Sequence, residues 1–508
     1  MSERMLVGQH IEHNARRFAH KIAVREAHGR EWTYSQLNRY ANRVAHALRS
    51  TGLGHGDKIG FLCDSRLEWI GLYIGVVKLG AVAVPVNYRQ TPKEIAQMLV
   101  DADVKLLFSL ASLASELGEM PNLTKTVLID GSDESSLDSF LDGKDDTNIQ
   151  ANVQASDPNV ILFTGGTTGR AKGVVLSHEN LFWNSIDEII DTHMHEGDNT
   201  LLSTPLHHSA ALNCWLLPHL YLGASVTLLP KYTAENALRA IATHGVTNGF
   251  MTPSMAREVY LCPLAQHADL STFRRWYIGG GVLAKPDRDL IHSLIPGVRI
   301  YYQYGLTEAG PIVTVLKEED AERGAGSIGR AFLNFEIKIL REDLTDAAIG
   351  EEGEMAVYGP PIMKGYYKRA EETAAAFHGD WLRTGDTGVM DENGFVYFGD
   401  RLKDMVKTGG LNVYSQEVER VLAHHSSVQE IAIIGLPSDK WGEEVTAIAV
   451  SKPGCALSAE ELIAFGRQHL AAYKVPKRVI FIPYEEMPIN FSGKLLKRQL
   501  RERFSNVT

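Results

Sequence analysis

The first 300 residues of this chain alternate short β-branched runs with segments of helical periodicity, and this alternation limits the fold more than any other feature of the sequence. A helix that follows each strand carries the chain back to the start of the next strand, so such strands pair in parallel. We therefore expect an α/β fold with mostly parallel, doubly wound sheet. The clearest apolar runs begin at Lys58, Ala81, Lys105, Thr126, Val160 and Ser225.

The pattern changes after the first 300 residues. Short strands separated by glycine turns run through residues 326–399 and predict a small antiparallel β unit. A compact α+β piece follows, with helices expected at 415–425 and 459–471. A chain of 508 residues exceeds what one hydrophobic core usually serves. We expect an N-terminal domain of residues 1–400, which includes the β unit, and a C-terminal domain of residues 401–508.

Charge and cysteine usage exclude several classes of protein. The chain carries 51 Lys and Arg against 62 Asp and Glu, and its net charge of −11 argues against a general nucleic-acid or anionic-membrane surface. The four cysteines stand far apart and predict neither a disulfide framework nor a zinc site. The longest apolar run, residues 69–86, is interrupted by Lys78 and Pro85, and the N-terminus lacks a signal-peptide pattern. We expect a cytoplasmic protein without nucleic-acid or integral membrane contact.

A glycine-rich segment between two apolar runs, ILFTGGTTGRAKGVVLSHENL at residues 161–181, has the composition of a phosphate-binding loop. It does not match the Walker A pattern, because Ala171 and Gly173 flank Lys172 and a second strand-like run follows. We expect a β-hairpin whose tip brings backbone N–H groups, threonine hydroxyls and one lysine to a polyphosphate. An exposed, turn-rich hairpin is the alternative. The expected phosphate ligands are Thr164, Gly165, Gly166, Thr167, Thr168, Gly169 and Lys172.

This segment resembles the T-S-G-T-T-G-x-P-K-G loop of the adenylate-forming superfamily, which includes acyl-CoA synthetases, adenylation domains and luciferases. Gly165 stands in place of the serine and Ala171 in place of the proline. Four further stretches resemble later motifs of the family and occur in the same order, so the likeness spans most of the chain. They are YYQYGLTEAG at 301–310, WLRTGDTG at 381–388, GDRLKDMVKTGGLNV at 399–413 and PINFSGKLLKRQL at 488–500.

The resemblance is to the acyl- and aryl-CoA synthetase branch of the superfamily and implies a two-step reaction. A carboxylate attacks ATP to give an acyl-adenylate and pyrophosphate, and the thiol of coenzyme A then takes the acyl group and releases AMP. The resemblance also implies two doubly wound sheets and a small antiparallel β-barrel in the N-terminal domain, followed by a mobile α+β C-terminal domain. ATP and coenzyme A would be substrates, and Mg²⁺ would be the metal.

The same likeness implies roles for residues around the nucleotide. Glu308 would bind Mg²⁺, which prefers carboxylate and phosphate oxygens, and Thr307 would bind the α-phosphate. Lys494 would be the catalytic lysine, with its cation between the carboxylate of the acid and the α-phosphate. The other expected contacts are Gly279, Gly280, Gly281, Tyr304 and Gly305 to the adenosine base, and Asp386 and Arg401 to the ribose.

A moving C-terminal domain is implied because the thiol must reach the carbonyl that Lys494 has just helped to activate. The family rotates that domain about a hinge residue between the two steps, and Lys403 matches the hinge. Gly409, Gly410 and Leu411 match the segment that then lines the coenzyme A tunnel, where Leu411 replaces a residue that is often charged or aromatic.

The acyl pocket is expected around TPLHHSAAL at 204–212, which resembles the segment that closes it in the family. His208 would orient the carboxylate and act with the catalytic residues, and His207 would fill a slot that is often aromatic. No acidic residue follows in 209–213 to pair with a substrate ammonium, which favours an acid without an α-amino group. The other expected wall residues suit an aromatic or medium-length aliphatic acid and are Trp183 or Asn184, Phe250, Met251, Gly280 and Gly281.

Two alternatives stay open. The chain could be a freestanding adenylation enzyme that loads a carrier protein through its phosphopantetheine arm. It could also be a nucleotide-binding protein of this fold without catalytic activity. The sequence leaves a homodimer open as well, and it does not identify the acid or its length.

Overall fold

In the computed structural model, the described residues are 2–164, 171–281, 283, 285–409, 411–438, 440–489 and 495–505. They belong to two compact units. The N-terminal unit comprises Met1–Arg323, Gly329–Glu336 and Val357–Leu382, and the C-terminal unit comprises Gly324–Ile328, Ile337–Ala356 and Arg383–Thr508. The second unit includes part of the predicted β unit together with the predicted C-terminal domain, and the domain boundary at residue 400 stays a prediction.

The first sheet of the N-terminal unit has seven strands. Its five strands β7, β4, β3, β5 and β6 pair in parallel, as the alternation of runs predicts, and β8 and β18 are antiparallel at one edge. The spatial order is β18 (Gly365–Tyr366), β8 (Lys172–Ser177), β7 (Pro158–Thr164), β4 (Val82–Pro85), β3 (Lys58–Leu62), β5 (Val104–Ser109) and β6 (Lys125–Leu128).

The second sheet has nine strands. The six strands from β13 to β1 pair in parallel, and β14, β15 and β2 are antiparallel at the two edges. Two mostly parallel sheets in one unit confirm this part of the predicted architecture. The spatial order is β15 (Arg330–Ala331), β14 (Ile312–Leu316), β13 (Arg299–Gly305), β12 (Arg275–Gly279), β11 (Asn248–Met251), β9 (Asn199–Leu202), β10 (Ser225–Leu228), β1 (Ile22–Glu26) and β2 (Glu31–Thr33).

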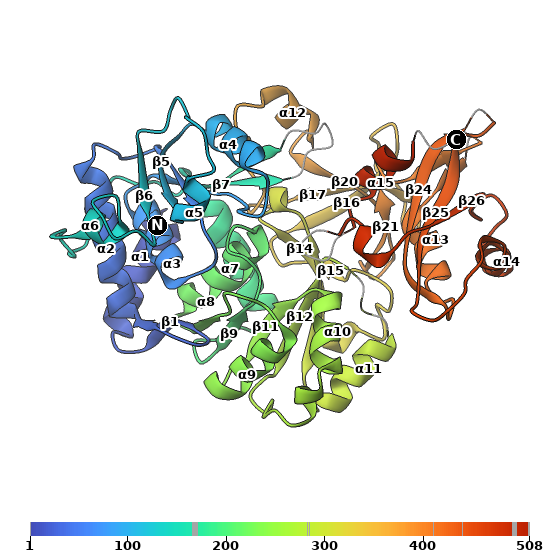
Figure 1. The fold of residues 1–508 in the computed structure, drawn as a ribbon, viewed down its shortest axis with the longest axis horizontal. Coiled ribbons are helices and arrows are strands. Elements are labelled where there is room, and N and C mark those ends of the chain that lie inside the picture. The colour runs from blue at the N-terminus through green and yellow to red at the C-terminus, as the bar shows by residue number, and fades with distance from the viewer. Residues whose placement is uncertain are drawn as a thin grey trace. The chain divides into compact units, whose positions relative to one another are not determined.

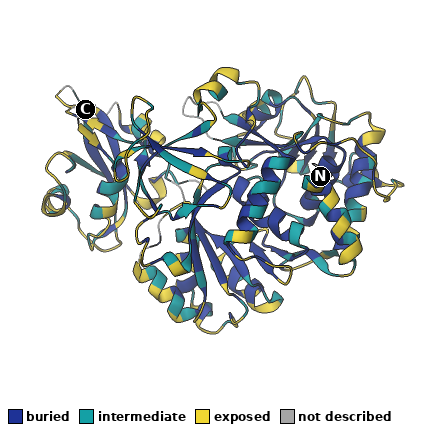
Figure 2. Ribbon diagram, turned by 180° about the vertical axis from the view of Figure 1, so that it is seen from behind, coloured by how far each residue is buried: buried dark blue, intermediate teal, exposed yellow. Residues whose placement is uncertain are grey.

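Helices cover the strands of both sheets, and the parallel strands are mostly buried (Figure 2). Figure 1 shows α9 (Ala234–His244), α10 (Pro253–Leu261) and α11 (Lys285–Leu294) together on one side of the nine-stranded sheet, where they share one apolar core. The other helices of this unit are α1 (Val7–Arg17), α2 (Tyr34–Ser50), α3 (Leu67–Lys78), α4 (Pro92–Asp101), α5 (Ala111–Ala114), α6 (Leu137–Leu141), α7 (His178–Asp191), α8 (Leu217–Leu222) and α12 (Ala370–Ala375), with η2 (Ala210–Leu216) a short π-helix.

The start of α7 is set by its sequence. Ser177 accepts a hydrogen bond from the Asn180 amide, and the Asn180 side chain accepts one from the Ser177 amide. This reciprocal capping box satisfies backbone donors that would otherwise be unpaired. Because Ser177 also ends β8, the chain passes from the glycine-rich hairpin directly into α7.

The longest apolar run of the sequence folds largely as α3, a twelve-residue helix that is buried along nearly its whole length. Among the helices that the structure describes, none combines the length and the apolar character that are needed to cross a bilayer.

The predicted antiparallel β unit is present as a third sheet. Strand β20 pairs antiparallel with β19 and β21, while closure into a barrel stays a prediction. Its strands are β16 (Glu336–Leu340), β17 (Glu352–Tyr358), β19 (Phe377–His378), β20 (Trp381–Met390) and β21 (Val396–Arg401).

The last part of the C-terminal unit is an α+β structure, as predicted. Helices α13 (Ser415–Leu422) and α14 (Ala459–His469) share one apolar core with its sheet, and α15 (Lys497–Phe504) shares a second core with it. The two cores use alternate residues of the long strands, which is the two-residue repeat of a sheet. The strands are β22 (Val406–Thr408), β23 (Leu411–Val413), β24 (Val428–Ser438), β25 (Gly442–Ser451) and β26 (Arg478–Phe481).

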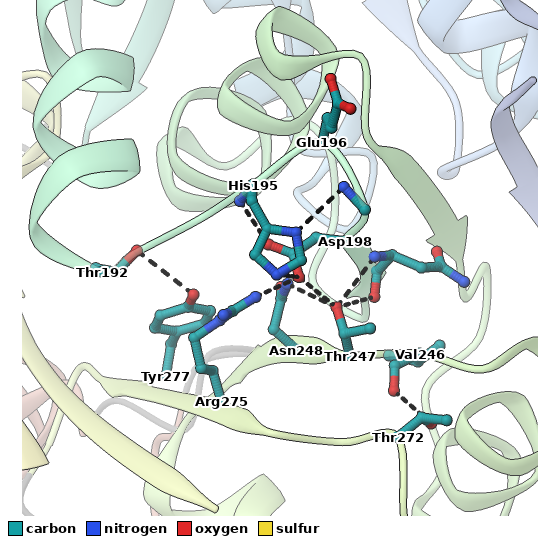
Figure 3. A network of polar contacts seen from close by, with 12 residues as sticks. Thr192, His195, Glu196, Asp198, Val246, Thr247, Asn248, Thr272, Arg275 and Tyr277 are labelled. Carbon is teal, nitrogen blue, oxygen red and sulfur yellow. Dashed lines mark hydrogen bonds and ion pairs between the residues drawn. The ribbon is translucent and has the colours of Figure 1, made fainter.

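A buried ion pair joins strands of the nine-stranded sheet near their amino ends (Figure 3). Arg275 Nη2 on β12 donates to Asp198 Oδ1, just before β9, and the two side chains are 10% and 0% exposed. The same carboxylate accepts from Thr247 Oγ1 at 2.9 Å and from the His195 amide at 2.8 Å. A buried charge pair supported by further hydrogen bonds fixes the strands to which it is attached.

Candidate active site

The glycine-rich segment forms the predicted hairpin. Strands β7 and β8 are antiparallel, and Thr164 lies opposite Lys172 at their ends. Two of the predicted phosphate ligands therefore stand beside each other at the base of the loop. The other five, Gly165, Gly166, Thr167, Thr168 and Gly169, lie outside the described residues.

A carboxylate lies next to the base of this hairpin. Glu308, in the short turn η4 (Thr307–Ala309), accepts from Thr164 Oγ1 at 3.5 Å and from the Tyr366 hydroxyl at 3.0 Å through the same oxygen. The ammonium of Lys172 lies 4.8 Å from the centre of the Tyr366 ring. Burial raises the pKa of Tyr366, so its hydroxyl stays protonated and donates to Glu308. Three strands and a turn thus bring these four side chains together.

This cluster fits the way in which Mg²⁺ binds in nucleotide sites. In the part of the chain that the structure describes, no group of three or more His, Cys, Asp or Glu side chains could hold a metal. Mg²⁺ does not need such a group, because it keeps several waters and commonly binds one or two carboxylates together with substrate phosphates. A single carboxylate beside a phosphate-type loop supplies that donor set, and Glu308 is the residue that would hold the ion.

The predicted α-phosphate ligand contacts the predicted acyl segment. Ser209 Oγ lies 3.0 Å from Thr307 Oγ1, which joins the residue after His208 to the residue before Glu308. Burial lowers the pKa of His208 to about 4 and that of His207 to about 3, so both rings are neutral at pH 7. The Ala210 amide donates to His208 Nδ1, which leaves the ring proton on Nε2.

Several of the residues predicted to contact adenosine are glycines, at positions where a side chain would introduce strain. A Cβ on Gly305 would lie 1.8 Å from the Pro311 carbonyl oxygen, and Gly280 has a positive φ of 79°. A Cβ on Gly279 would lie 2.9 Å from the Phe250 ring. Tyr304, between Gly305 and the buried part of β13, is half-buried. Close backbone packing accounts for Gly305, a positive φ for Gly280 and the neighbouring Phe250 ring for Gly279. The contact of these glycines with a nucleotide stays a prediction.

The predicted wall residues of the acyl pocket do not all come together. Phe250 stacks on Trp215 of η2 with ring centres 5.5 Å apart, whereas Met251 belongs to the apolar core with α9, α10 and α11. Neighbouring strand residues face opposite sides of a sheet, so β11 can present only one of the two to η2. On α7 the Trp183 ring contacts Phe182, and Asn184 is the buried residue that donates to the Asn213 carbonyl at 3.1 Å.

In the C-terminal unit the two predicted ribose ligands lie side by side. Asp386 on β20 is directly opposite Arg401 on β21, and Asp386 Oδ1 is 3.7 Å from Arg401 Nε. The Asp386 side chain is largely buried and that of Arg401 is about one-third exposed. Residues fifteen positions apart in the sequence are adjacent here because the two strands form an antiparallel pair.

The predicted hinge is held by a residue that the sequence did not single out. Arg501 on α15 donates to the Lys403 carbonyl at 2.9 Å and pairs with the Asp404 carboxylate. Burial is the main cause that lowers the pKa of Lys403. The hinge segment is therefore attached to the last helix in this conformation.

The predicted tunnel segment contacts a tryptophan. The Gly409 amide donates to the Trp441 carbonyl at 2.8 Å, and a Cβ on Gly409 would lie 3.0 Å from the indole ring. Trp441 is 38% exposed and Leu411 is 49% exposed, so the segment presents apolar surface. Gly410 and the predicted catalytic Lys494 lie outside the described residues. No local sequence signal indicated this contact, because Trp441 lies far along the chain from Gly409.

Glu188 on α7 leads to a prediction about stability. Its carboxyl is wholly buried, and burial raises its pKa to about 8 from the usual value of 4.5. Between these values the unfolded chain has lost this proton and the folded chain has kept it, so the free energy of unfolding falls as pH rises. Glu188→Gln should remove this loss. The gain in free energy of unfolding over the wild type should be larger at pH 8 than at pH 5 by on the order of 2–4 kcal/mol, and the melting temperature should rise accordingly.

Melting curves of both proteins at half-unit steps from pH 4.5 to pH 8.5 provide the check. Asp187, whose pKa burial raises to about 7, titrates in both proteins. Because its charge also raises the pKa of Glu188, the difference between the two proteins includes the coupling of these carboxyls. A constant difference across this pH range would show that Glu188 does not titrate with the folding equilibrium.

Two protein-family models match the chain. The model described as AMP-binding enzyme matches residues 11–367, and the model described as AMP-binding enzyme C-terminal domain matches residues 417–494. The chain is 34% identical over 491 residues to a feruloyl-CoA synthase of an Amycolatopsis species, with 96% of this chain and 97% of that protein covered. It is 32% identical over 486 residues to an indoleacetate–CoA ligase of Aromatoleum aromaticum, with 94% of each covered. The solved structure of ATP-bound MatB from Rhodopseudomonas palustris matches over 100% of both chains, with a TM-score of 0.89 and 28% identity.

Proposed function

The chain belongs to the family of AMP-binding enzymes, and on that premise we propose that it is an acyl- or aryl-CoA ligase. It would join a carboxylic acid to AMP with release of pyrophosphate, and then transfer the acyl group to the thiol of coenzyme A with release of AMP. One observation carries the proposal, which is the contact of Glu308 with Thr164 at the base of a glycine- and threonine-rich hairpin. That arrangement supplies a metal-binding carboxylate beside donors for a polyphosphate.

The first step must bring an anionic acid to an anionic phosphate. Lys172, Thr164 and the hairpin amides would hold the β- and γ-phosphates, and Thr307 would donate to the α-phosphate. Mg²⁺, when bound at Glu308, would neutralise phosphate charge. His208 is neutral and carries its proton on Nε2, so it can donate to the carboxylate of the acid and orient it without competing as a cation.

The ribose is assigned to Asp386, whose two carboxylate oxygens suit the two ribose hydroxyls, with Arg401 beside it. Lys494 would supply the cation that bridges the two anions as they react. The second step would follow rotation of the C-terminal domain about Lys403. It would bring the Gly409–Leu411 segment, together with Trp441, to the pantetheine arm of coenzyme A.

An acid without an α-amino group is proposed as the substrate. Residues 209–213, Ser-Ala-Ala-Leu-Asn, offer no carboxylate to an ammonium group. The aromatic side chains of Phe250 and Trp215 favour a flat or apolar acyl group. Ferulate and indoleacetate, the acids in the names of two relatives, are aromatic acids of this kind.

The proposal is tested by pyrophosphate release with ATP and Mg²⁺ across benzoates, cinnamates, indole acids, and short and long fatty acids, each with and without coenzyme A. Release that depends on one acid class and accelerates with coenzyme A would support the ligase. Release that ignores coenzyme A would favour a carrier protein as the acceptor. Absence of release with every acid would overturn the proposal and leave a nucleotide-binding protein.

Glu308→Gln should lower the rate of pyrophosphate release at least about 100-fold, because an amide is a much weaker ligand for Mg²⁺ than a carboxylate. The Mg²⁺ concentration for half-maximal rate should rise, and Mn²⁺ should restore part of the activity. Tyr366→Phe is the matched control, since it removes a hydrogen bond to Glu308 but keeps the carboxylate. An equal loss in both variants would contradict a metal-binding role for Glu308.

A further inference from the structure

Five wholly or nearly wholly buried side chains meet where α7, η2 and β13 pack together, and we call them the buried polar cluster: Asn184, Glu188, Asn213, Cys214 and Gln303. Gln303 Nε2 donates to Glu188 Oε2 at 2.9 Å. Asn213 Nδ2 donates to the Gly310 carbonyl at 3.3 Å, and Asn184 Nδ2 donates to the Asn213 carbonyl. The cluster is connected, but these contacts do not use all of its polar atoms.

Two amide oxygens of the cluster lack a hydrogen-bond partner among the residues that the structure describes: Asn213 Oδ1 and Gln303 Oε1. Glu188 keeps its proton in the folded chain and lies beside the Cys214 thiol, so its second oxygen is not counted with them. The Gly310 carbonyl can only accept, which fixes the Asn213 amide with its oxygen turned away. An amide oxygen is an acceptor and never a donor. A buried acceptor without a partner destabilises the fold, so such groups in folded proteins usually serve a ligand or a water.

Residues of the buried polar cluster lie on the same chain segments as residues of the proposed reaction site. Ser209, which contacts Thr307, comes immediately before η2, and Asn213 follows about one helical turn later. Gln303 immediately precedes Tyr304 and Gly305 on β13. An acid whose carboxylate lies near Ser209 and Thr307 would therefore direct its other end along η2, towards the unpaired oxygens.

Aromatic side chains on neighbouring strands limit what can lie beside η2. Trp215, the residue after Cys214, stacks between Phe250 at 5.5 Å and Tyr277 at 4.4 Å. Phe250 in turn packs over Gly279. Three stacked rings are a rigid wall, and they favour a flat acyl group of about one or two rings over a long flexible chain.

We propose that the acid carries a hydroxyl or amino group at the end remote from its carboxylate, and that Gln303 and Asn213 accept the hydrogen of that group. This inference rests on the proposed ligase function and narrows its substrate class to aromatic or short acids with such a donor. A site built around unpaired acceptors rejects the analogue that lacks the donor, because that analogue leaves the same oxygens buried and unpaired.

The test compares pairs of acids that differ by one hydroxyl group: 4-hydroxycinnamate with cinnamate, 3-hydroxybenzoate with benzoate, and 8-hydroxyoctanoate with octanoate. For each pair the ratio of the two kcat/KM values is measured by pyrophosphate release. The ratio cancels the fraction of active enzyme, so partial unfolding of a variant does not distort it. Wild-type protein should prefer the hydroxylated member of at least one aromatic pair by more than about 10-fold.

Gln303→Met keeps the length and burial of the side chain but removes the acceptor, and it should bring that ratio to about 2 or less. Thr200→Val is the matched control, because Thr200 on β9 is another wholly buried side chain whose oxygen has no hydrogen-bond partner among the described residues. The ratio measured for this variant should equal that of the wild type. Ratios near 1 in the wild type, or equal ratios in wild type and Gln303→Met, would overturn the inference. They would leave the ligase function intact, with a buried water in the cluster. No release with any acid would overturn the ligase function, and with it this inference.

Discussion

Replacing Lys494 by alanine should lower acyl-adenylate formation by at least about two to three decades, or about 3–4 kcal/mol of transition-state stabilisation. The cation is expected to bridge two anions that approach each other only as they react, so its loss raises the barrier more than it weakens binding. Thioester formation from supplied acyl-adenylate should survive, because that step does not require the lysine. Acid-dependent pyrophosphate release measures the first step, and acyl-CoA formation from synthetic acyl-adenylate measures the second.

Lys403→Pro is the complementary variant. Proline restricts the backbone at the predicted hinge, so this variant should keep adenylate formation and lose thioester formation. Arg498→Ala is the matched control for charge, since Arg498 is an exposed cation four residues after Lys494 and pairs only with Glu502 among its described contacts. Equal losses of both steps in the Lys494 and Lys403 variants would contradict rotation of the C-terminal domain between them.

Asp198→Asn should destabilise the N-terminal unit by about 3–5 kcal/mol, because it leaves the Arg275 guanidinium buried without its counter-charge. The two side chains are 0% and 10% exposed, so water cannot replace the lost partner. Asparagine has the size and shape of aspartate, which keeps packing nearly constant and isolates the effect of charge. The urea midpoint, followed by tryptophan fluorescence at pH 7, measures the loss.

The double variant Asp198→Asn/Arg275→Gln separates charge from packing. It removes both charges and should recover part of the stability that Asp198→Asn loses, since no unpaired ion remains buried. A double variant less stable than the single variant would show that the hydrogen bonds of this network, rather than its charges, hold the strands together.

Local periodicity was sufficient to predict the mostly parallel strands, while the division into two sheets was implied by the family resemblance. The runs that begin at Lys58, Ala81, Lys105, Thr126, Val160 and Ser225 all correspond to strands of the two mostly parallel sheets. Strand and helix periods follow from backbone geometry within a few residues, so they can be read without knowledge of long-range contacts. The hairpin at Thr164 and Lys172 was predicted for the same reason.

The sequence also indicated the family through motifs, whose glycines and acids keep fixed spacings along the chain. It could not decide which neighbours face the proposed site. Trp183 or Asn184, Phe250 and Met251 were expected at the acyl pocket. Helix rotation places Asn184 towards η2 and strand alternation places Phe250 there, while contact of any of them with an acyl group stays a prediction.

Tertiary structure alone identified the partners of these motifs. Tyr366 reaches Glu308 from a strand 58 residues later, Arg501 reaches Lys403 across 98 residues, and Gln303 reaches Glu188 across 115. Side chains so far apart in sequence meet only after sheets and helices have packed, and no local pattern records which of them will pair. The sequence determined the elements, the family and the expected chemistry. Packing decided which amide oxygens among the described residues are left unpaired near the proposed acyl site, and hence which acid we propose.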